Sequence, residues 1–384
     1  MSYDGALDAL GLSQVVPYLL GLAAQGVGLT LISFEKEERW RERERREALD
    51  RRLRAAGIAW RPLRYHRRPR LPATAYDLVR GARAIRAAVR RTGATLVHCR
   101  AEVAMAMARL ARLPRGVRVL HDMRALFSAE RVAAGSWAAG GTLDRLVRRV
   151  EEANLRRADA LVTLTERGQA AVASHLRPGL PTAVIPTCVD LDAFTPRAEG
   201  TPAAHGIAYS GSLGALYLAR EMVDFARAFS ARTASRALFM TPQPEVAVAA
   251  GLDPSWADVG AEAPAAVPAR LRTARAVLFF LRDYAGAPAA CPTKFAEALA
   301  CGLPVACTRG IGDLDRLLGR ERIGVLVEGF TPAARDAAIL ALLRLLNEPG
   351  LAARCRRVAE EHFGLALGVA AYHRLYRELG RGVR

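Results

Sequence analysis

The sequence predicts an α/β protein with two parallel-sheet domains. Its 384 residues exceed what one ordinary hydrophobic core organises. Short apolar runs alternate with segments of helical periodicity along the chain, which is typical of parallel sheets covered by helices on both faces. The alternation pauses at residues 187–202, where Pro196, Gly200 and Pro202 gather. We therefore expect a first domain at residues 1–186, a linker at 187–202, a second domain at 203–363, and a final helix at 364–384.

Composition places the chain among globular proteins. Hydrophobic residues make up 51% and charged residues 24%, which argues against a disordered body. Lys and Arg outnumber Asp and Glu by 56 to 38, so the net charge is +18. Nucleic acid, an anionic membrane surface and phosphorylated substrates all fit this charge, and so does an arginine-rich composition without a functional meaning. The six cysteines form no C-x-x-C pair and are typical of a reduced, cytosolic protein.

The first domain is expected to alternate strands and helices. No charged residue occurs between Asp8 and Glu35, but Pro17 and several glycines argue against a membrane span there. The helix of this segment is placed at residues 13–25, and a charged helix follows at 35–57. Strands are predicted at residues 29–34, 58–63, 95–99, 118–121, 160–165 and 182–186, and further helices at 77–89, 102–112, 143–150 and 168–175.

The second domain repeats this alternation. Strands are predicted at residues 207–210, 237–240, 277–281, 304–307 and 323–327, and helices at 219–231, from 292, and at 339–346. The last two helices, at 349–363 and 365–379, have no strand between them. We therefore expect the final helix to pack back on the first domain. Two such sheets with glycine turns after their strands place a ligand-binding cleft at the carboxyl ends of the strands.

The stretch from Phe280 to Asp313 carries the clearest chemical signal. A helix that opens at Pro292 and Thr293 presents unpaired amides and its dipole to a flexible loop, which forms a seat for an anion. Glu297 lies one turn into this helix, where its carboxylate can accept hydrogen bonds from a diol such as ribose. A phosphate seat beside a diol acceptor indicates a nucleotide.

The chain resembles glycosyltransferase family 4 over nearly its whole length. The resemblance rests on the ordered pieces DGALDALGLSQVVPYLLGLAAQG, LTLISFE, HDMRALFSAE, RRADALVTLTE, VIPTCVDLDAF, YSGSLGALY, PTKFAEALACGLPV and GIGD. It implies the GT-B fold, in which two Rossmann-like parallel-sheet domains face each other across a cleft. It also implies a retaining hexosyltransferase that moves a sugar from a UDP-, GDP- or dTDP-linked donor to a hydroxyl. Glycan, lipid-linked and small-molecule acceptors are all open, in cell-envelope polysaccharide, glycolipid or other glycoconjugate biosynthesis.

The resemblance also assigns site residues. Glu297 matches the carboxylate that binds the donor ribose, and His121 matches a histidine near the donor sugar. Lys294, Glu297 and His121 are therefore the expected catalytic group. Donor binding is expected at Gly211, Ser212, Leu213, Gly214, Thr293, Lys294, Glu297, Gly310, Ile311, Gly312 and Asp313. The acceptor side is expected at Gly5, Gly11, Gln14 and Arg124. For the glycine loop at 211–214, a plain tight turn is the alternative.

The sequence departs from the family pattern in three places. The first of two expected glutamates falls on Ala289, so PTKFAE replaces the paired-glutamate motif. The basic residues expected after the glycine loop are missing, since Ser212 and Tyr217 lie near those positions. Because the leaving diphosphate concentrates negative charge, Lys294 is the predicted replacement. The chain also begins where a relative would already have completed its first strand, so we expect either that the chain start is misplaced, with Met1 internal to a longer product, or that the first sheet is incomplete.

No metal or other cofactor is expected. The triplets Asp190-Leu191-Asp192 and Asp313-Leu314-Asp315 resemble a metal-binding signature, but one lies in the linker and the other at a helix start.

Three alternatives stay open at this stage. A nucleotide-sugar 2-epimerase of the same fold would use a similar donor seat. A basic nucleic-acid-binding protein fits the charge, although the arginines are spread over the chain. The basic loop at residues 61–70 suggests either peripheral contact with an anionic membrane by a cytoplasmic protein or a solvated loop.

Overall fold

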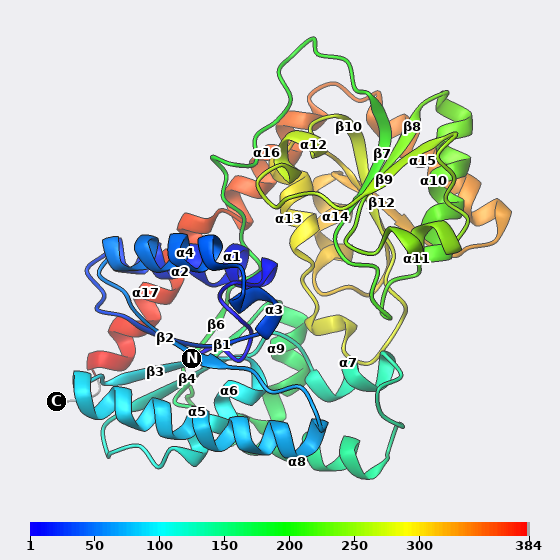
Figure 1. The fold of residues 1–384 in the computed structure, drawn as a ribbon. Coiled ribbons are helices and arrows are strands. Elements are labelled where there is room, and N and C mark those ends of the chain that lie inside the picture. The colour runs from blue at the N-terminus through cyan, green and yellow to red at the C-terminus, as the bar shows by residue number, and fades with distance from the viewer. Residues whose placement is uncertain (382–384) are drawn as a thin grey trace. The chain divides into compact units, whose positions relative to one another are not determined.

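A computed structural model describes residues 1–381 and divides the chain into two compact units (Figure 1). Unit 1 contains Met1–Ser128, Ala139–Pro186 and the segment that begins at Leu365. Unit 2 contains Ala129–Ala138 and Thr187–Gly364. Each unit has its own parallel sheet, so the predicted α/β class is confirmed.

The sheet of unit 1 falls into two parts joined by the first residues of the chain. Its strands are β1 (Thr30–Glu35), β2 (Ala59–Arg64), β3 (Leu96–Arg100), β4 (Arg118–Asp122), β5 (Ala160–Thr163) and β6 (Thr182–Val184). One part has the order β1-β2, and the other has the order β3-β4-β5-β6, with every pair parallel. Ser2 forms parallel bridges to both Ser33 and Arg100, so it stands between β1 and β3.

Helices cover both faces of this sheet. They are α1 (Ala9–Gln14), α2 (Val16–Ala24), α3 (Glu37–Trp40), α4 (Arg43–Ala55), α5 (Arg70–Thr92), α6 (Ala101–Leu110), α8 (Thr142–Arg157), α9 (Glu166–Val172), the 3₁₀ turn η1 (Ala173–His175) and α17 (Leu365–Arg381). Adjacent residues of β1 point to opposite sides, as a pleated strand requires. Leu31 packs in a core with Val16, whereas Ile32 packs in a core with Ile85 of α5.

Two predicted helices are divided in the structure. The one placed at residues 13–25 is two helices that meet at Val15, and the charged one at 35–57 is α3 followed by α4. In α4 the apolar Leu49 and Leu53 are buried, and the surrounding charges form exposed pairs such as Arg43 with Glu47. Charged residues therefore cover the solvent face of this helix, as the sequence suggested.

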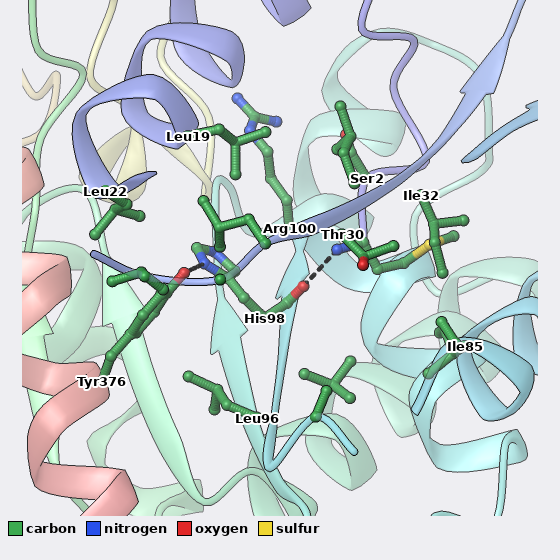
Figure 2. A pocket seen from close by; sticks show the side chains of 18 of the residues that line it. Ser2, Leu19, Leu22, Thr30, Ile32, Ile85, Leu96, His98, Arg100 and Tyr376 are labelled. Carbon is green, nitrogen blue, oxygen red and sulfur yellow. Dashed lines mark hydrogen bonds between the residues drawn. The ribbon is translucent and has the colours of Figure 1, made fainter. Parts of the chain in front are cut away.

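The last helix belongs to unit 1. In Figure 1 the red α17 lies beside the blue α2, although they stand at opposite ends of the chain. The rings of Tyr18 and Tyr372 meet edge to face with centres 5.5 Å apart, and the Tyr376 hydroxyl lies 2.6 Å from Nδ1 of His98. These contacts pack α17 against α2 and β3 of unit 1 (Figure 2).

Unit 2 has one six-stranded parallel sheet. Its strands are β7 (His205–Ser210), β8 (Arg236–Met240), β9 (Ala257–Gly260), β10 (Ala274–Phe279), β11 (Val305–Thr308) and β12 (Gly324–Val327), in the order β12-β11-β10-β7-β8-β9. Its helices are α10 (Ala219–Thr233), α11 (Pro244–Ala249), α12 (Val267–Leu271), η2 (Ala287–Ala289), α13 (Thr293–Ala300), α14 (Leu314–Glu321), α15 (Pro332–Leu346) and α16 (Leu351–His362). Helix α7 (Phe127–Ala133) begins in a unit 1 segment and ends in the short unit 2 segment.

Two features of unit 2 differ from the sequence predictions. Strand β9 was not predicted, because it is a short edge strand in a passage rich in proline and alanine. The expected linker at 187–202 is held to α16, since the Arg356 guanidinium donates to the carbonyls of Phe194 (2.6 Å) and Leu191 (3.1 Å). Within residues 1–381, no helix is both long enough and apolar enough to cross a bilayer.

Candidate functional site

The loops at the carboxyl edge of the unit 2 sheet collect most of the predicted donor residues. Strands β7, β10 and β11 are neighbours and run in parallel, so the loops that follow them leave the sheet at the same edge. These loops are residues 211–218, 280–292 and 309–313. The second leads directly into α13, which carries Thr293, Lys294 and Glu297.

Lys294 lies in an aromatic cage at this edge. Only 6% of its surface is exposed, and its ammonium donates to the Tyr217 hydroxyl at 2.5 Å. The same Nζ lies 4.0 Å from the centre of the Tyr217 ring. The rings of Tyr209 and Phe279 are 5.3 and 5.8 Å away. Aromatic faces attract cations, so they hold the charge in place without neutralising it by a carboxylate. The cage therefore presents a fixed positive charge that an anion can still pair with.

The glycine loop approaches this lysine closely. A Cβ added to Gly211 would lie 3.3 Å from both Cε and Nζ of Lys294, which is a tight contact. Gly211 also has φ of +121°, a backbone conformation that residues with a side chain rarely adopt. The amide of Gly211 donates to the Met240 carbonyl, and the amide of Leu213 donates to the Gln243 side chain. Ser212 accepts a hydrogen bond from the Tyr209 hydroxyl through its carbonyl at 2.6 Å. The structure thus brings the loop and Lys294 together, but two of the loop's four amides already have protein partners.

Glu297 lies one turn after Lys294 on the same helix. The side chain is half-buried, and no hydrogen bond to its carboxylate forms within residues 1–381. Burial raises the pKa of Glu297 from its ordinary value of 4.5 to about 7, against the opposing effect of the Lys294 charge. A carboxylate without a protein donor, next to a caged cation, is chemically suited to accept hydrogen bonds from a diol.

The backbone amides of the turn at residues 310–313 make more hydrogen bonds within the protein than predicted. The amide of Gly310 donates to the Asp315 carboxylate at 3.0 Å, and the amide of Gly312 donates to the Ala287 carbonyl at 2.9 Å. Ile311 is 1% exposed. Asp313 stands at the N-cap position of α14, but its side chain makes no capping hydrogen bond there. As positioned here, this turn is a less direct phosphate seat than the start of α13.

The two aspartate triplets have structural partners. Asp315 holds the Gly310 amide, and the Asp190 carboxylate accepts from the amides of Asp192 and Ala193. Ala289, at the position of the first family glutamate, is 2% exposed in η2. The residue at this position is therefore buried and carries no carboxylate.

His121 is buried in unit 1 and paired with an acid. His121 lies in β4 and none of its surface is exposed. Its Nε2 lies 3.1 Å from the Glu102 carboxylate. Burial lowers the pKa of His121 but the Glu102 charge raises it further, so the net direction is upward. Asn154 donates to the same carboxylate at 2.7 Å. The role of His121 toward a sugar stays a prediction; its Nδ1 is buried and makes no hydrogen bond within residues 1–381.

The acceptor-side residues lie in two places in unit 1. Glu35 organises the loop between Gly5 and helix α1, which contains Gly11, because its carboxylate accepts from the amides of Ala6 (2.8 Å) and Leu7 (3.1 Å). A Cβ on Gly11 would lie 2.1 Å from the Gly5 carbonyl oxygen, so the turn needs glycine there. Gln14, at the end of α1, is buried and lines a cavity of unit 1.

Arg124 is part of a separate buried network. Its guanidinium donates to Asp122 at 3.3 Å, and the opposite carboxylate oxygen of Asp122 lies 3.3 Å from His98. The pKa of Asp122 is below its ordinary value, because the charges of Arg124 and its other partners overcome the effect of burial. This network fixes Arg124 and leaves it little exposed, with 10% of its side chain in contact with solvent.

Several residues that build these sites were not predicted from the sequence. Gln243, Glu35, Glu102 and Asp315 each hold a backbone amide or a charged partner of a predicted residue. Only Glu35 could have been identified from the sequence. It follows a buried strand, and a carboxylate at the carboxyl end of such a strand is well placed to accept hydrogen bonds from a neighbouring loop. Gln243 and Glu102 come from other parts of the chain than the residues they contact, and Asp315 lies five residues after Gly310.

Comparison with known families adds an independent result. Residues 14–188 match the family described as glycosyl transferase 4-like domain, which covers most of unit 1 before its final helix. No curated protein sequence matches the chain at a significant level.

Solved structures resemble the chain along nearly its full length. Sucrose-phosphate synthase from Thermosynechococcus elongatus is 18% identical with a TM-score of 0.67, and the match covers 95% of this chain and 92% of that one. Anabaena HepE in complex with UDP and glucose is 13% identical with a TM-score of 0.66, covering 98% of each chain. AviGT4, a glycosyltransferase of avilamycin A biosynthesis, is 18% identical with a TM-score of 0.58, covering 95% and 88%. The chain therefore has the GT-B fold of two Rossmann-like domains, and its residues 14–188 are similar to the glycosyl transferase 4-like domain.

Proposed function

We propose that the protein is a glycosyltransferase that uses a nucleotide-sugar donor. The observation that carries this proposal is the caged Lys294 beside the start of α13, with Glu297 one turn further on. A cation and helix amides suit a diphosphate, and a half-buried carboxylate suits the ribose diol. The glycosyl transferase 4-like match and the UDP present in the HepE structure support the same class of donor.

The proposed chemistry is a retaining transfer. The bond between the sugar's anomeric carbon and the diphosphate oxygen breaks first, and the electron pair goes to the leaving diphosphate. Lys294 and the amides at the start of α13 stabilise that charge where it develops. The acceptor hydroxyl then bonds to the anomeric carbon from the same face, and its proton passes to a phosphate oxygen of the leaving group. No protein nucleophile and no metal ion takes part in this proposal.

The acceptor is proposed to be a hydroxyl compound that contacts unit 1. The loop around Gly5 and Gly11 has a fixed shape set by Glu35, which suits the recognition of a defined glycan or lipid-linked acceptor better than a flexible loop would. Within this proposal the hexosyl type of donor and a role in cell-envelope polysaccharide synthesis follow from the family resemblance.

We expect at least one nucleotide sugar to stabilise the protein. UDP-glucose, GDP-mannose and dTDP-glucose are each added in turn, and the melting temperature is followed by thermal shift. A ligand present at 100 times its dissociation constant adds about 2.7 kcal/mol of stability, which raises the melting temperature by several degrees. If none of the three does so, the proposal fails.

Two further measurements separate the alternatives. An epimerase would interconvert the donor sugar without an acceptor, which NMR of the incubated donor detects. A nucleic-acid-binding protein would show steeply salt-dependent binding to random DNA and no response to nucleoside diphosphates.

A further inference from the structure

The hydroxyl group of Tyr217 stands directly beside the ammonium group of Lys294. The two groups lie 2.5 Å apart, and Nζ of Lys294 is also 4.0 Å from the centre of the Tyr217 ring. The lysine is buried, with 6% of its surface exposed, whereas the tyrosine is half-buried. Tyr217 is therefore the more accessible member of the pair.

The chemistry of the two groups fixes the direction of the hydrogen bond between them. An ammonium group has three N–H donors and no acceptor, so the Tyr217 oxygen must accept this bond. The hydrogen of the tyrosine hydroxyl is then left to donate in another direction, away from Lys294. Within residues 1–381, it meets no protein acceptor. The hydroxyl therefore keeps one donor for a ligand.

The other tyrosine of the cage, Tyr209, has no such spare donor. Its hydroxyl donates to the Ser212 carbonyl at 2.6 Å, and the residue is fully buried. Its ring packs edge to face against the Tyr217 ring, with the ring centres 6.0 Å apart. Tyr209 thus supports the cage from behind, and of the two hydroxyls it is the one of Tyr217 that a ligand can use.

The backbone on both sides of Tyr217 is held in place. The Leu218 amide donates to the Phe280 carbonyl at 2.9 Å. The Arg282 amide donates in the opposite direction, to the Leu216 carbonyl at 3.0 Å. These bonds join the loop after β7 to the loop after β10 in an antiparallel bridge at residue 217. A donor on a fixed backbone needs little rearrangement when its ligand arrives.

We propose that the Tyr217 hydroxyl binds the donor diphosphate directly, by donating to a phosphate oxygen next to the one that Lys294 binds. This inference rests on the proposed nucleotide-sugar donor. Two donors 2.5 Å apart can bond to neighbouring oxygens of one phosphate group. The bond from the ammonium also polarises the hydroxyl, which makes its O–H a stronger donor. The pair then offers one positive charge and one neutral donor to the same phosphate.

The first measurement compares a nucleoside diphosphate with its nucleoside. UDP, GDP and dTDP are titrated into the wild-type protein by calorimetry, and the tightest binder is then titrated into Tyr217→Phe, which keeps the ring of the cage and removes the hydroxyl. We expect the affinity for the diphosphate to fall about fivefold or more, because a hydrogen bond to a charged group is lost. The affinity for the matching nucleoside, measured by competition, should not change, because a nucleoside has no phosphate.

A double variant separates direct binding from positioning of the lysine. If the hydroxyl binds the phosphate itself, Tyr217→Phe should also lower the affinity of the Lys294→Ala protein, by about threefold or more. A hydroxyl that serves only to hold the lysine has no role left in that background, so the absence of a further loss there would overturn the proposal. Tyr76→Phe is the control and should keep full affinity, because Tyr76 is an exposed tyrosine of unit 1.

The outcomes distinguish this inference from the proposed function. If the wild type binds a diphosphate and Tyr217→Phe binds it equally tightly, the inference fails while the donor site stands. An equal loss of affinity for the nucleoside would also overturn the inference, because the hydroxyl would then shape the site as a whole. If the wild type binds none of the three diphosphates, the proposed function fails, and this inference fails with it.

Discussion

Lys294→Ala is expected to weaken UDP binding by at least tenfold while leaving the unliganded protein as stable as wild type or more so. A hydrogen bond to a charged group contributes about 1.5–3 kcal/mol, which corresponds to roughly 10- to 150-fold in affinity. Within residues 1–381, no carboxylate is hydrogen-bonded to this buried ammonium, which donates to the Tyr217 hydroxyl. Removing a buried charge of this kind costs little stability. Calorimetric titration with UDP and thermal melting of the free protein measure both effects.

The chain supplies a matched control for this prediction. Lysine occurs at only two positions among its 384 residues, and the other, Lys36, forms an exposed pair with Asp8 in unit 1. Lys36→Ala should leave UDP affinity unchanged. Lys294→Arg should restore the charge but not the fit, because a planar guanidinium cannot occupy a cage sized for an ammonium. If Lys294→Ala binds UDP as tightly as wild type, Lys294 does not contact the diphosphate.

Glu297→Gln is expected to gain stability relative to wild type as the pH rises. The pKa of Glu297 is raised from 4.5 to about 7, so the folded protein holds this proton over a range in which the unfolded chain has released it. Stability contributed by the neutral acid is complete below pH 4.5 and is lost as the pH rises toward 7. At 1.36 kcal/mol for each pKa unit, the gap between variant and wild type should widen by about 3 kcal/mol between pH 4.5 and pH 8.

Urea unfolding of both proteins at several pH values measures this gap. Glu245→Gln is the matched control, because Glu245 is an exposed carboxylate of the same unit. A constant gap for Glu297→Gln would mean that this carboxyl group has the same pKa in the folded and unfolded states, and hence that it is well solvated in the folded protein. That result would also remove the reason to expect a diol in its place.

The elements that followed from the sequence are those with strong local signals. The period of Ala82, Ile85 and Val89 predicted α5, and all three are buried in it. Apolar runs predicted the central strands of both sheets. A strand covered by helices on both faces buries the side chains of both faces, so its sequence is a nearly continuous apolar run. The start of α13 was predicted from Pro292 and Thr293, and the structure begins the helix at Thr293.

Long-range contacts decided the rest, because nothing local in the sequence specifies them. The sequence by itself determined the two α/β domains, the α13 seat and the pairing of Lys294 with Glu297 on one helix face. Only the tertiary structure placed Tyr217 and Tyr209 around Lys294, tied Gly310 to Asp315 and enclosed His121 with Glu102. It also placed Ser2 between β1 and β3, since the pairing of strands depends on which edges meet and not on the composition of either strand.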